Sequence, residues 1–338
     1  MTTFRLLTVT RLINERKLCV FVIFGTMVMT YAIFFSNLKQ NTMLEYLTQP
    51  ERSEVLTLET ASLSKMALDI SKEHTFVMVT LINAAYIPFT LSWLCNTKHM
   101  NINQHVLFLT TDEQTDNMLK KYWPGVKSVV LQGIDSKGNE TYSQVGYVKL
   151  MVKRTEALMS ILEENVPIFL FEVDCLWLKN PVPFLLTHQN FDIVSTKVSN
   201  RDSVIAGGFL YLSPNESTKR LWKELTRRMI ALYNKIRALP PMKLISEGDN
   251  DQQYLSALIR NKYKGIKVKL LDAMDFPDGQ WYKLSKEKRQ LSKPYIINNN
   301  WVVGNFEKIK RAKKWKHWFL KEDNTCDGEN LALLKEQR

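Results

Sequence analysis

The sequence is poor in the residues that define several common classes of protein. It has four cysteines and five histidines in 338 residues, too few for a disulfide-dense scaffold, and no H-x-x-H or C-x-x-C spacing indicates a metal centre. Twelve glycines and eleven prolines exclude a collagen-like or low-complexity chain. Hydrophobic residues make up 45% of the chain and charged residues 24%, which excludes intrinsic disorder. The length fits one large α/β domain with accessory segments, or two small domains.

Positive charge is unevenly distributed along the chain. The formal net charge is +12, and from Lys262 onward eighteen Lys and Arg residues stand against ten Asp and Glu residues. A basic segment of this kind can favour nucleic acid, membrane headgroups or a small anionic substrate. Because Trp, Phe and Asp interrupt the basic residues, the pattern by itself selects no partner.

The longest uncharged stretch lies near the N-terminus. Residues 18–36 carry no charge, and as a helix they would span roughly 28 Å, close to the hydrocarbon thickness of a bilayer. Residues 1–17 are basic, so the positive-inside rule predicts a cytosolic tail followed by a transmembrane signal anchor. A cleaved signal peptide and a buried helix are the alternatives. The stretch is long for a signal peptide, and Ser36-Asn37-Leu38 is a poor cleavage site.

The remaining chain divides into three predicted parts. Residues 37–72 are polar, which suits a stem, with a hydrophobic spacing that allows a short helix. A folded domain is predicted at 73–322 and a C-terminal tail at 323–338. In the folded domain, apolar runs alternate with helical patterns, which predicts parallel strand pairing and ligands at the carboxyl ends of the strands. We expect strands at 75–81, 105–110, 126–131, 167–171, 191–195 and 208–212, and helices at 89–96, 113–122 and 146–165.

Two acidic residues follow the strand predicted at 167–171. In an extended chain Glu172 and Asp174 share one face, roughly 6–7 Å apart. Carboxylates at the end of a buried strand are costly unless they are paired or bound to a metal. Two acidic oxygen donors suit a hard divalent cation, Mg²⁺ or Mn²⁺, which also accepts phosphate oxygens as ligands. On spacing alone, a solvated turn with two incidental acids is an equal alternative.

The stretch around these acids is similar to a known family. Residues 171–183, FEVDCLWLKNPVP, resemble the D-x-D-x-x-W-x-x-x-P signature of the nucleotide-diphospho-sugar transferases, which are Golgi glycosyltransferases related to plant cell-wall xylosyl- and arabinosyltransferases. The resemblance covers roughly residues 74–320. It implies a GT-A-like three-layer α/β/α sandwich with a mixed, mostly parallel sheet. Further blocks that match in order are TLIN at 80–83 with Trp93, IAGGFLY at 205–211, DNDQ at 249–252, FPDG at 276–279, PYIINNNWVVG at 294–304, and the basic segment with Trp315 and Trp318.

The resemblance implies a metal site with two departures from the family pattern. Glu172 and Asp174 would hold the cation, and Asn298 would be the third ligand. The family usually has Asp at the first of these positions and His at the last. An amide oxygen binds a hard cation without contributing charge, so the site is either weaker or holds its metal mainly through substrate phosphates. Both departures also fit a protein that has lost catalysis. An Asp174 far from any cavity, with Asn298 directed elsewhere, would contradict the enzyme hypothesis.

Roles in catalysis and donor binding are likewise implied by the resemblance. Asp251 and Gln252 are expected beside the anomeric carbon, although a helix N-cap is an alternative role here, because Asp249 and Asp251 suit that position equally well. Thr80 and Asn83 are expected near the nucleotide base and ribose. The other expected donor-binding residues are Lys153 and Lys308 for the diphosphate, Gly207 and Gly208 for close backbone approach to a ligand, and Gly304. For Lys153, pairing with a carboxylate or a solvated position on a helix is an equal alternative. For the two glycines, packing against a neighbouring strand is the alternative.

The resemblance thus predicts a type II Golgi membrane glycosyltransferase with a lumenal catalytic domain. It would move a sugar from a nucleotide-diphosphate donor to a glycan or glycoprotein acceptor, with retention of configuration and with Mn²⁺ or Mg²⁺ as cofactor. A catalytically inactive protein that binds glycans or nucleotide sugars is the alternative. The anchor and the lumenal topology disfavour nucleic acid as a partner.

Two further features are consistent with a lumenal domain. Asn139 and Asn215 begin N-x-[ST] glycosylation sequons. Outside the apolar stretch the chain has three cysteines, Cys95, Cys175 and Cys326, an odd number that allows one disulfide and one buried thiol in an oxidising compartment.

Overall fold

The structure is a computed structural model that describes residues 50–133, 138, 140–198 and 201–336. The predicted cytosolic tail at 1–17, the predicted anchor at 18–36 and Asn139 lie outside the described residues. Among the helices that are described, none is both long enough and apolar enough to cross a bilayer.

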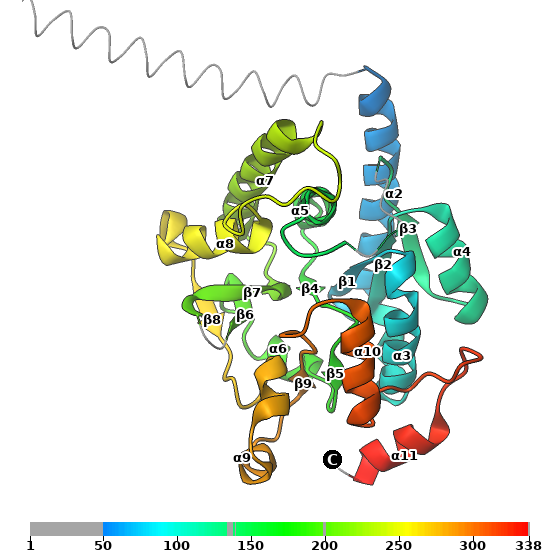
Figure 1. The fold of residues 1–338 in the computed structure, drawn as a ribbon. Helices are drawn as coiled ribbons and strands as arrows, with labels where there is room; N and C mark the ends of the chain where they lie inside the picture. The colour runs from blue at the N-terminus through cyan, green and yellow to red at the C-terminus, as the bar shows by residue number, and fades with distance from the viewer. Residues whose placement is uncertain (1–49, 134–137, 139, 199–200, 337–338) are drawn as a thin grey trace, which may run out of the picture. The chain divides into compact units, whose positions relative to one another are not determined.

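A seven-stranded sheet runs through the centre of the part of the chain that the structure describes (Figure 1). Its order is β3-β2-β1-β4-β7-β6-β8, and neighbouring strands are parallel except where β7 runs antiparallel to β4 and β6. The predicted mixed, mostly parallel sheet is therefore confirmed. The strands are β1 Val77–Ile82, β2 Val106–Thr110, β3 Lys127–Val130, β4 Ile168–Leu170, β6 Ile193–Val198, β7 Arg201–Leu212 and β8 Val268–Leu270.

Helices cover both faces of this sheet because side chains along each strand alternate between two buried clusters. Val77 and Val79 of β1 belong to one cluster, whereas Met78 and Ile82 belong to the other. The first cluster is completed by α2 Pro50–His74, α5 Val145–Glu163, α7 Glu216–Ile236 and α8 Asp251–Arg260. The second is completed by α3 Ile87–Thr97, α4 Glu113–Tyr122, α6 Val182–Leu186, α10 Asn305–Lys314 and α11 Gly328–Glu336.

A small second sheet brings distant parts of the chain to the end of β4. Strand β5, Leu176–Trp177, pairs antiparallel with β9, Ile296–Ile297. The acidic segment that precedes β5 and the asparagine-rich segment that follows β9 are therefore held close together. Between them in the sequence lies α9, Lys286–Leu291.

The folded region begins earlier than predicted. Helix α2 occupies much of the segment expected to be a stem, and its side chains Leu63, Ala67 and Ile70 are at most 2% exposed. They belong to the first hydrophobic cluster, so the boundary predicted at 72/73 is wrong. Because polar residues separate these apolar positions, the overall composition of the segment does not indicate a buried helix.

The folded region also ends later than predicted. Cys326 forms a disulfide with Cys95 of α3, and Leu334 of α11 is 2% exposed. Residues 323–336 therefore belong to the fold, and the boundary predicted at 322/323 is wrong. Cys175 is a free, half-buried thiol, so the arrangement of one disulfide and one thiol that the sequence allowed occurs, with the thiol less buried than expected.

The disulfide closes a loop of 231 residues, and a crosslink over such a length strongly restricts the unfolded chain. We expect the double variant Cys95→Ser, Cys326→Ser to lose about 2–5 kcal/mol of unfolding free energy, measured by urea denaturation. Reductant should lower the stability of the wild type to that of the variant and leave the variant unchanged. Equal stability of the two proteins without reductant would contradict a stabilising role for this bridge.

Candidate functional site

Glu172 and Asp174 line the same cavity at the carboxyl end of β4. The chain turns at Val173 and Asp174 rather than continuing as a strand, so the expectation of an extended segment was wrong in detail. Asp174 is 7% exposed and Glu172 is half-buried. Two acids that approach each other with this little water require compensating positive charge.

Lys308 of α10 supplies positive charge to Asp174. Its Nζ lies 2.6 Å from Asp174 Oδ2, and its side chain is 17% exposed. Burial disfavours the ammonium ion and is the largest single effect, but the hydrogen bond to Asp174 and the attractions of Asp174, Tyr86 and Glu172 together outweigh it, so the pKa of Lys308 is raised. Lys308 is therefore charged at neutral pH. Oδ1 of Asp174 is buried and has no hydrogen-bond partner among the described residues.

Glu172 accepts a hydrogen bond from the segment that follows β9. Burial and then repulsion from Asp174 raise the pKa of Glu172, while Lys308 and Arg154 act in the opposite direction. Asn298, directly after β9, donates a hydrogen bond of 3.4 Å from Nδ2 to Glu172 Oε2. Within the described part of the chain, Oδ1 of Asn298 is buried without a partner. Asn298 therefore contacts Glu172, although it lines a different pocket from the cavity that contains both acids.

Gly208 of β7 makes room for the Glu172 side chain. A Cβ at this position would overlap the carboxyl group of Glu172, so glycine lets that carboxylate lie against the strand. At Gly207 a Cβ would lie 2.9 Å from Gln252 Cβ, and the Gly207 N–H donates to Gln252 Oε1 at 3.0 Å. The close approaches at both glycines are made by side chains of this chain, and the predicted approach to a ligand stays a prediction.

Lys153 does not line the cavity, contrary to the expected diphosphate role. Its Nζ lies 3.6 Å from Glu156 Oε2 on the same helix. The next residue, Arg154, lines the cavity instead. Helical spacing places Arg154 three residues after buried Met151 and four before buried Leu158, a signal in the sequence that identifies the inward face of α5.

Arg154 is fixed by two contacts in the interior. Its Nη2 lies 2.5 Å from Asp251 Oδ2 and donates to the Gly207 carbonyl at 3.2 Å. Burial opposes the charge on Arg154 and is the largest single effect, but Asp251, Tyr147 and Glu172 together outweigh it, so the pKa of the guanidinium is raised. Arg154 therefore brings a second permanent positive charge to the cavity wall.

Asp251 and Gln252 do not line the cavity, so their contacts give no support to a position beside the anomeric carbon. Asp251 pairs with Arg154, and Gln252 accepts the hydrogen bond from β7. The N-cap of α8 is Asn250, whose side chain accepts from the N–H of Gln253 at 2.9 Å, so neither Asp249 nor Asp251 has the N-cap role considered from the sequence. Asp251 and Gln252 thus contact Arg154 and strand β7, respectively, and stabilise the wall of the cavity without lining it.

The end of β1 forms another wall of the cavity, where Thr80 and Asn83, the residues expected near the nucleotide base and ribose, line it. Thr80 is 1% exposed and Asn83 is 4% exposed. Asn83 Nδ2 donates to the carbonyl of Gly138 at 2.7 Å. Tyr86, which the sequence analysis missed, also lines the cavity, and burial raises its pKa to about 12.

Two other predicted residues lie outside the cavity. Gly304 immediately precedes α10 with a φ of +83°, a conformation that favours glycine, and Lys308 follows one turn later. Asn215 is exposed and caps α7, where its Oδ1 accepts from the N–H of Thr218 and its Nδ2 donates to Asp192.

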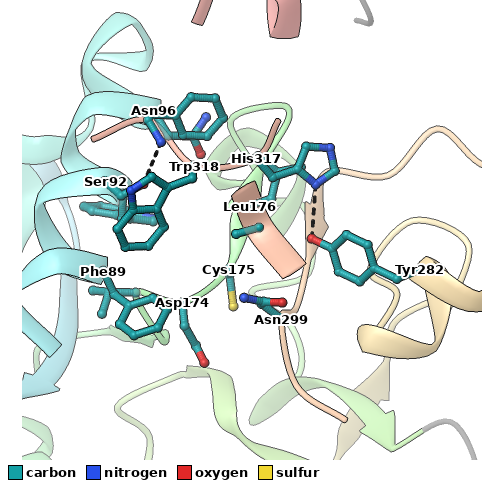
Figure 2. A pocket seen from close by; sticks show the side chains of 14 residues that line it. Phe89, Ser92, Asn96, Asp174, Cys175, Leu176, Tyr282, Asn299, His317 and Trp318 are labelled. Atoms are coloured by element: carbon teal, nitrogen blue, oxygen red, sulfur yellow. Dashed lines mark hydrogen bonds between the residues drawn. The ribbon is translucent and has the colours of Figure 1, made fainter. Parts of the chain in front are cut away.

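A separate pocket lies on another side of Asp174 (Figure 2). Cys175, Asn299 and Tyr282 line it, and the Tyr282 hydroxyl lies 3.1 Å from His317 Nδ1. Burial raises the pKa of the Cys175 thiol, which is therefore neutral. Asp174 is the only carboxylate among the residues lining this pocket. The paired acids and cations belong to the first cavity, which we call the acidic cavity.

Comparison with known proteins gives a consistent result. The nucleotide-diphospho-sugar transferase family profile matches residues 101–312. Relatives from Arabidopsis thaliana include UDP-D-xylose:L-fucose alpha-1,3-D-xylosyltransferase 3, 22% identical over 82% of this chain and 79% of that protein. Another is arabinosyltransferase XEG113, 24% identical over 78% of this chain and 43% of that protein.

Solved structures with a similar fold include GlyE, a glycosyltransferase of Streptococcus pneumoniae, with a TM-score of 0.43 and 15% identity over 78% of this chain. The match spans 63% of the GlyE chain. Mouse xyloside xylosyltransferase 1 has a TM-score of 0.40 and 12% identity, over 67% of this chain and 98% of that one.

The family match contains both acids, Asn298 and Lys308. The chain therefore belongs to the nucleotide-diphospho-sugar transferase family. It is a glycosyltransferase that depends on a nucleotide sugar.

The contact between Gly208 and Glu172 leaves no room for a larger residue at position 208. We expect Gly208→Ala to displace the Glu172 carboxylate and to lower nucleotide-sugar turnover by about 10²-fold, the typical cost of losing one electrostatic group at a reacting centre. The unfolding free energy should fall by about 1–3 kcal/mol from overpacking. Gly328→Ala is the matched control, because nothing lies within 4 Å of the added Cβ. Unchanged turnover in Gly208→Ala would show that the position of Glu172 does not matter.

Proposed function

We propose that this protein transfers a sugar from a nucleotide-diphosphate donor to a glycan or glycoprotein acceptor with the help of a divalent cation. Glu172, Asp174 and Asn298 would hold Mn²⁺ or Mg²⁺, and the donor would occupy the acidic cavity. The observation that carries this proposal is the pair of carboxylates in one cavity, with Lys308 on Asp174 and the Asn298 side chain on Glu172.

The residues present fit a hard cation. Asp174 Oδ1 and Asn298 Oδ1 are buried acceptors without partners in the described residues, and each such atom costs about 1–3 kcal/mol. A divalent cation would satisfy both and would favour the ionised form of Glu172. No group of three or more His, Cys, Asp and Glu side chains with metal-binding geometry occurs within the described ranges. Only two of the proposed ligands are charged, so donor phosphates are needed to complete the coordination.

When bound, the cation would stabilise the negative charge of the departing diphosphate. The chain itself supplies two further positive charges at the cavity wall, Lys308 and Arg154. Asp251 holds Arg154 in place, whereas Lys308 is held by Asp174 itself. A phosphate group competes for the Lys308 ammonium, so Lys308 can exchange from the carboxylate to the donor.

The acidic cavity has a volume of about 90 Å³, below the roughly 300–1,000 Å³ of typical ligand sites. Donor binding therefore requires lining side chains to move. Lys308 and Tyr86 are the residues we expect to move, because both come from outside the central strands.

The finer features of the proposal are supported by the sequence and by the relatives. The relatives include enzymes named for UDP-D-xylose, so UDP-sugars are the first donors to test. A GT-A-like organisation and retention of configuration are proposed from the family resemblance. The apolar stretch at 18–36 and the basic residues before it support a type II anchor in the Golgi membrane, with the catalytic domain in the lumen.

Asp174→Asn tests the proposed role of the carboxylate. We expect turnover of UDP-sugars to fall by at least about 10²-fold, because the amide cannot neutralise the cation. Asp116→Asn is a matched control, since Asp116 is also 7% exposed and also pairs with a lysine, Lys120, at 2.7 Å. It should lose stability but retain turnover. Full metal-dependent activity in Asp174→Asn would refute the assignment.

Nucleotide binding distinguishes an enzyme from an inactive binding protein. We expect isothermal titration to show that Mn²⁺ strengthens UDP binding by at least about tenfold, which is about 1.4 kcal/mol. Lys308→Gln should weaken UDP binding with and without Mn²⁺, because it removes a phosphate contact. UDP binding that is insensitive to Mn²⁺ would favour a catalytically inactive protein that binds nucleotide sugars.

A further inference from the structure

A larger cavity lies outside the acidic cavity, with a volume of about 590 Å³. Its walls come from the end of β5, from α9 and the segment after it, and from two tryptophans, Trp281 and Trp315. None of the proposed metal ligands lines it, and neither do Arg154 or Lys308. We call it the basic groove.

The basic groove has an excess of positive charge. Lys179, Lys286, Arg289 and Lys293 line it, and no Asp or Glu does. Within the described residues, none of these four side chains forms a salt bridge with a carboxylate. This differs from the acidic cavity, where Lys308 and Arg154 each have an acidic partner. Unpaired positive charges around a concave surface attract an anionic ligand.

Two indole rings stand beside these charges. The centroids of Trp281 and Trp315 are 5.8 Å apart, and both side chains are half-buried. The Arg289 guanidinium lies 4.7 Å from the Trp315 ring centroid and 5.7 Å from that of Trp281. Stacking and a hydrogen bond to the Leu284 carbonyl hold Arg289 in one orientation. The groove therefore offers a fixed, charged donor beside flat apolar surfaces.

We propose that the basic groove binds an acidic oligosaccharide, a chain of sugars that carry carboxylates, and anchors the acceptor outside the reaction site. Indole faces stack on the apolar faces of sugar rings, and a guanidinium pairs with a carboxylate through two parallel hydrogen bonds. The acceptor role rests on the proposed function, whereas binding itself does not. A glycan is favoured over nucleic acid because the chain belongs to a family of sugar transferases.

The test uses the purified full-length chain and a hexamer of mannuronate prepared from alginate. The fully methyl-esterified hexamer has the same rings without the charge. We expect the acid form to bind and to change tryptophan fluorescence, and the ester to bind at least about tenfold more weakly. Lys286→Gln with Lys293→Gln should weaken binding of the acid by about tenfold, because two exposed charge contacts are lost. Lys98→Gln with Lys121→Gln, two exposed lysines outside the groove, is the matched control and should have no effect.

The outcomes separate this inference from the proposed function. The groove variant should bind UDP and turn over a UDP-sugar without acceptor as the wild type does, so a failure of the enzyme proposal would not affect the binding result. Equal affinity for acid and ester, no binding by the wild type, or equal weakening by the control pair would overturn the proposal. Tighter binding of an RNA hexamer than of the mannuronate hexamer would also overturn it and would indicate a site for nucleic acid.

Discussion

The site depends on the cost of placing Glu172 and Asp174 side by side at the end of a buried strand. Each carboxylate is shielded from water and repels the other, and burial raises the pKa of Glu172. The positive charge of Lys308, which pairs with Asp174, offsets this cost. Because that lysine comes from a helix close to the end of the chain, the acids tie α10 to the central sheet.

The supporting residues form a second layer that links three elements. Arg154 of α5, Asp251 of α8 and the backbone of Gly207 in β7 are joined by an ion pair and hydrogen bonds. Gln252 extends this connection by accepting from the Gly207 N–H. Since β7 is the one antiparallel strand of the main sheet in the described region, its position beside β4 is held by side chains as well as by the strand ladder.

The sequence predicted six of the seven strands of the main sheet and the location of the acids, because both depend on local patterns, but it missed β8 and the small sheet of β5 and β9. The helix predicted at 113–122 has the same bounds as α4, and the ordered motifs identified the family. Contacts between segments that are distant in the sequence were harder to predict. Lys153 was chosen over Arg154 although the helical spacing of buried residues favours the latter, and the overlap of Gly208 with Glu172 depends on the pairing of β4 with β7. Helix α2 was missed as core because its apolar residues are spaced among polar ones.

The bridge between Cys95 and Cys326 has a consequence for how the protein can be made. Lys308 lies inside the covalent loop that this bridge closes. Its helix, α10, lies in the sequence between strand β9 and the crosslinked Cys326. A chain synthesised in a reducing cytosol would lack this disulfide. Recombinant protein from such a host is therefore a poor reference for the arrangement of the acidic cavity, and secretion or oxidative refolding is the appropriate route.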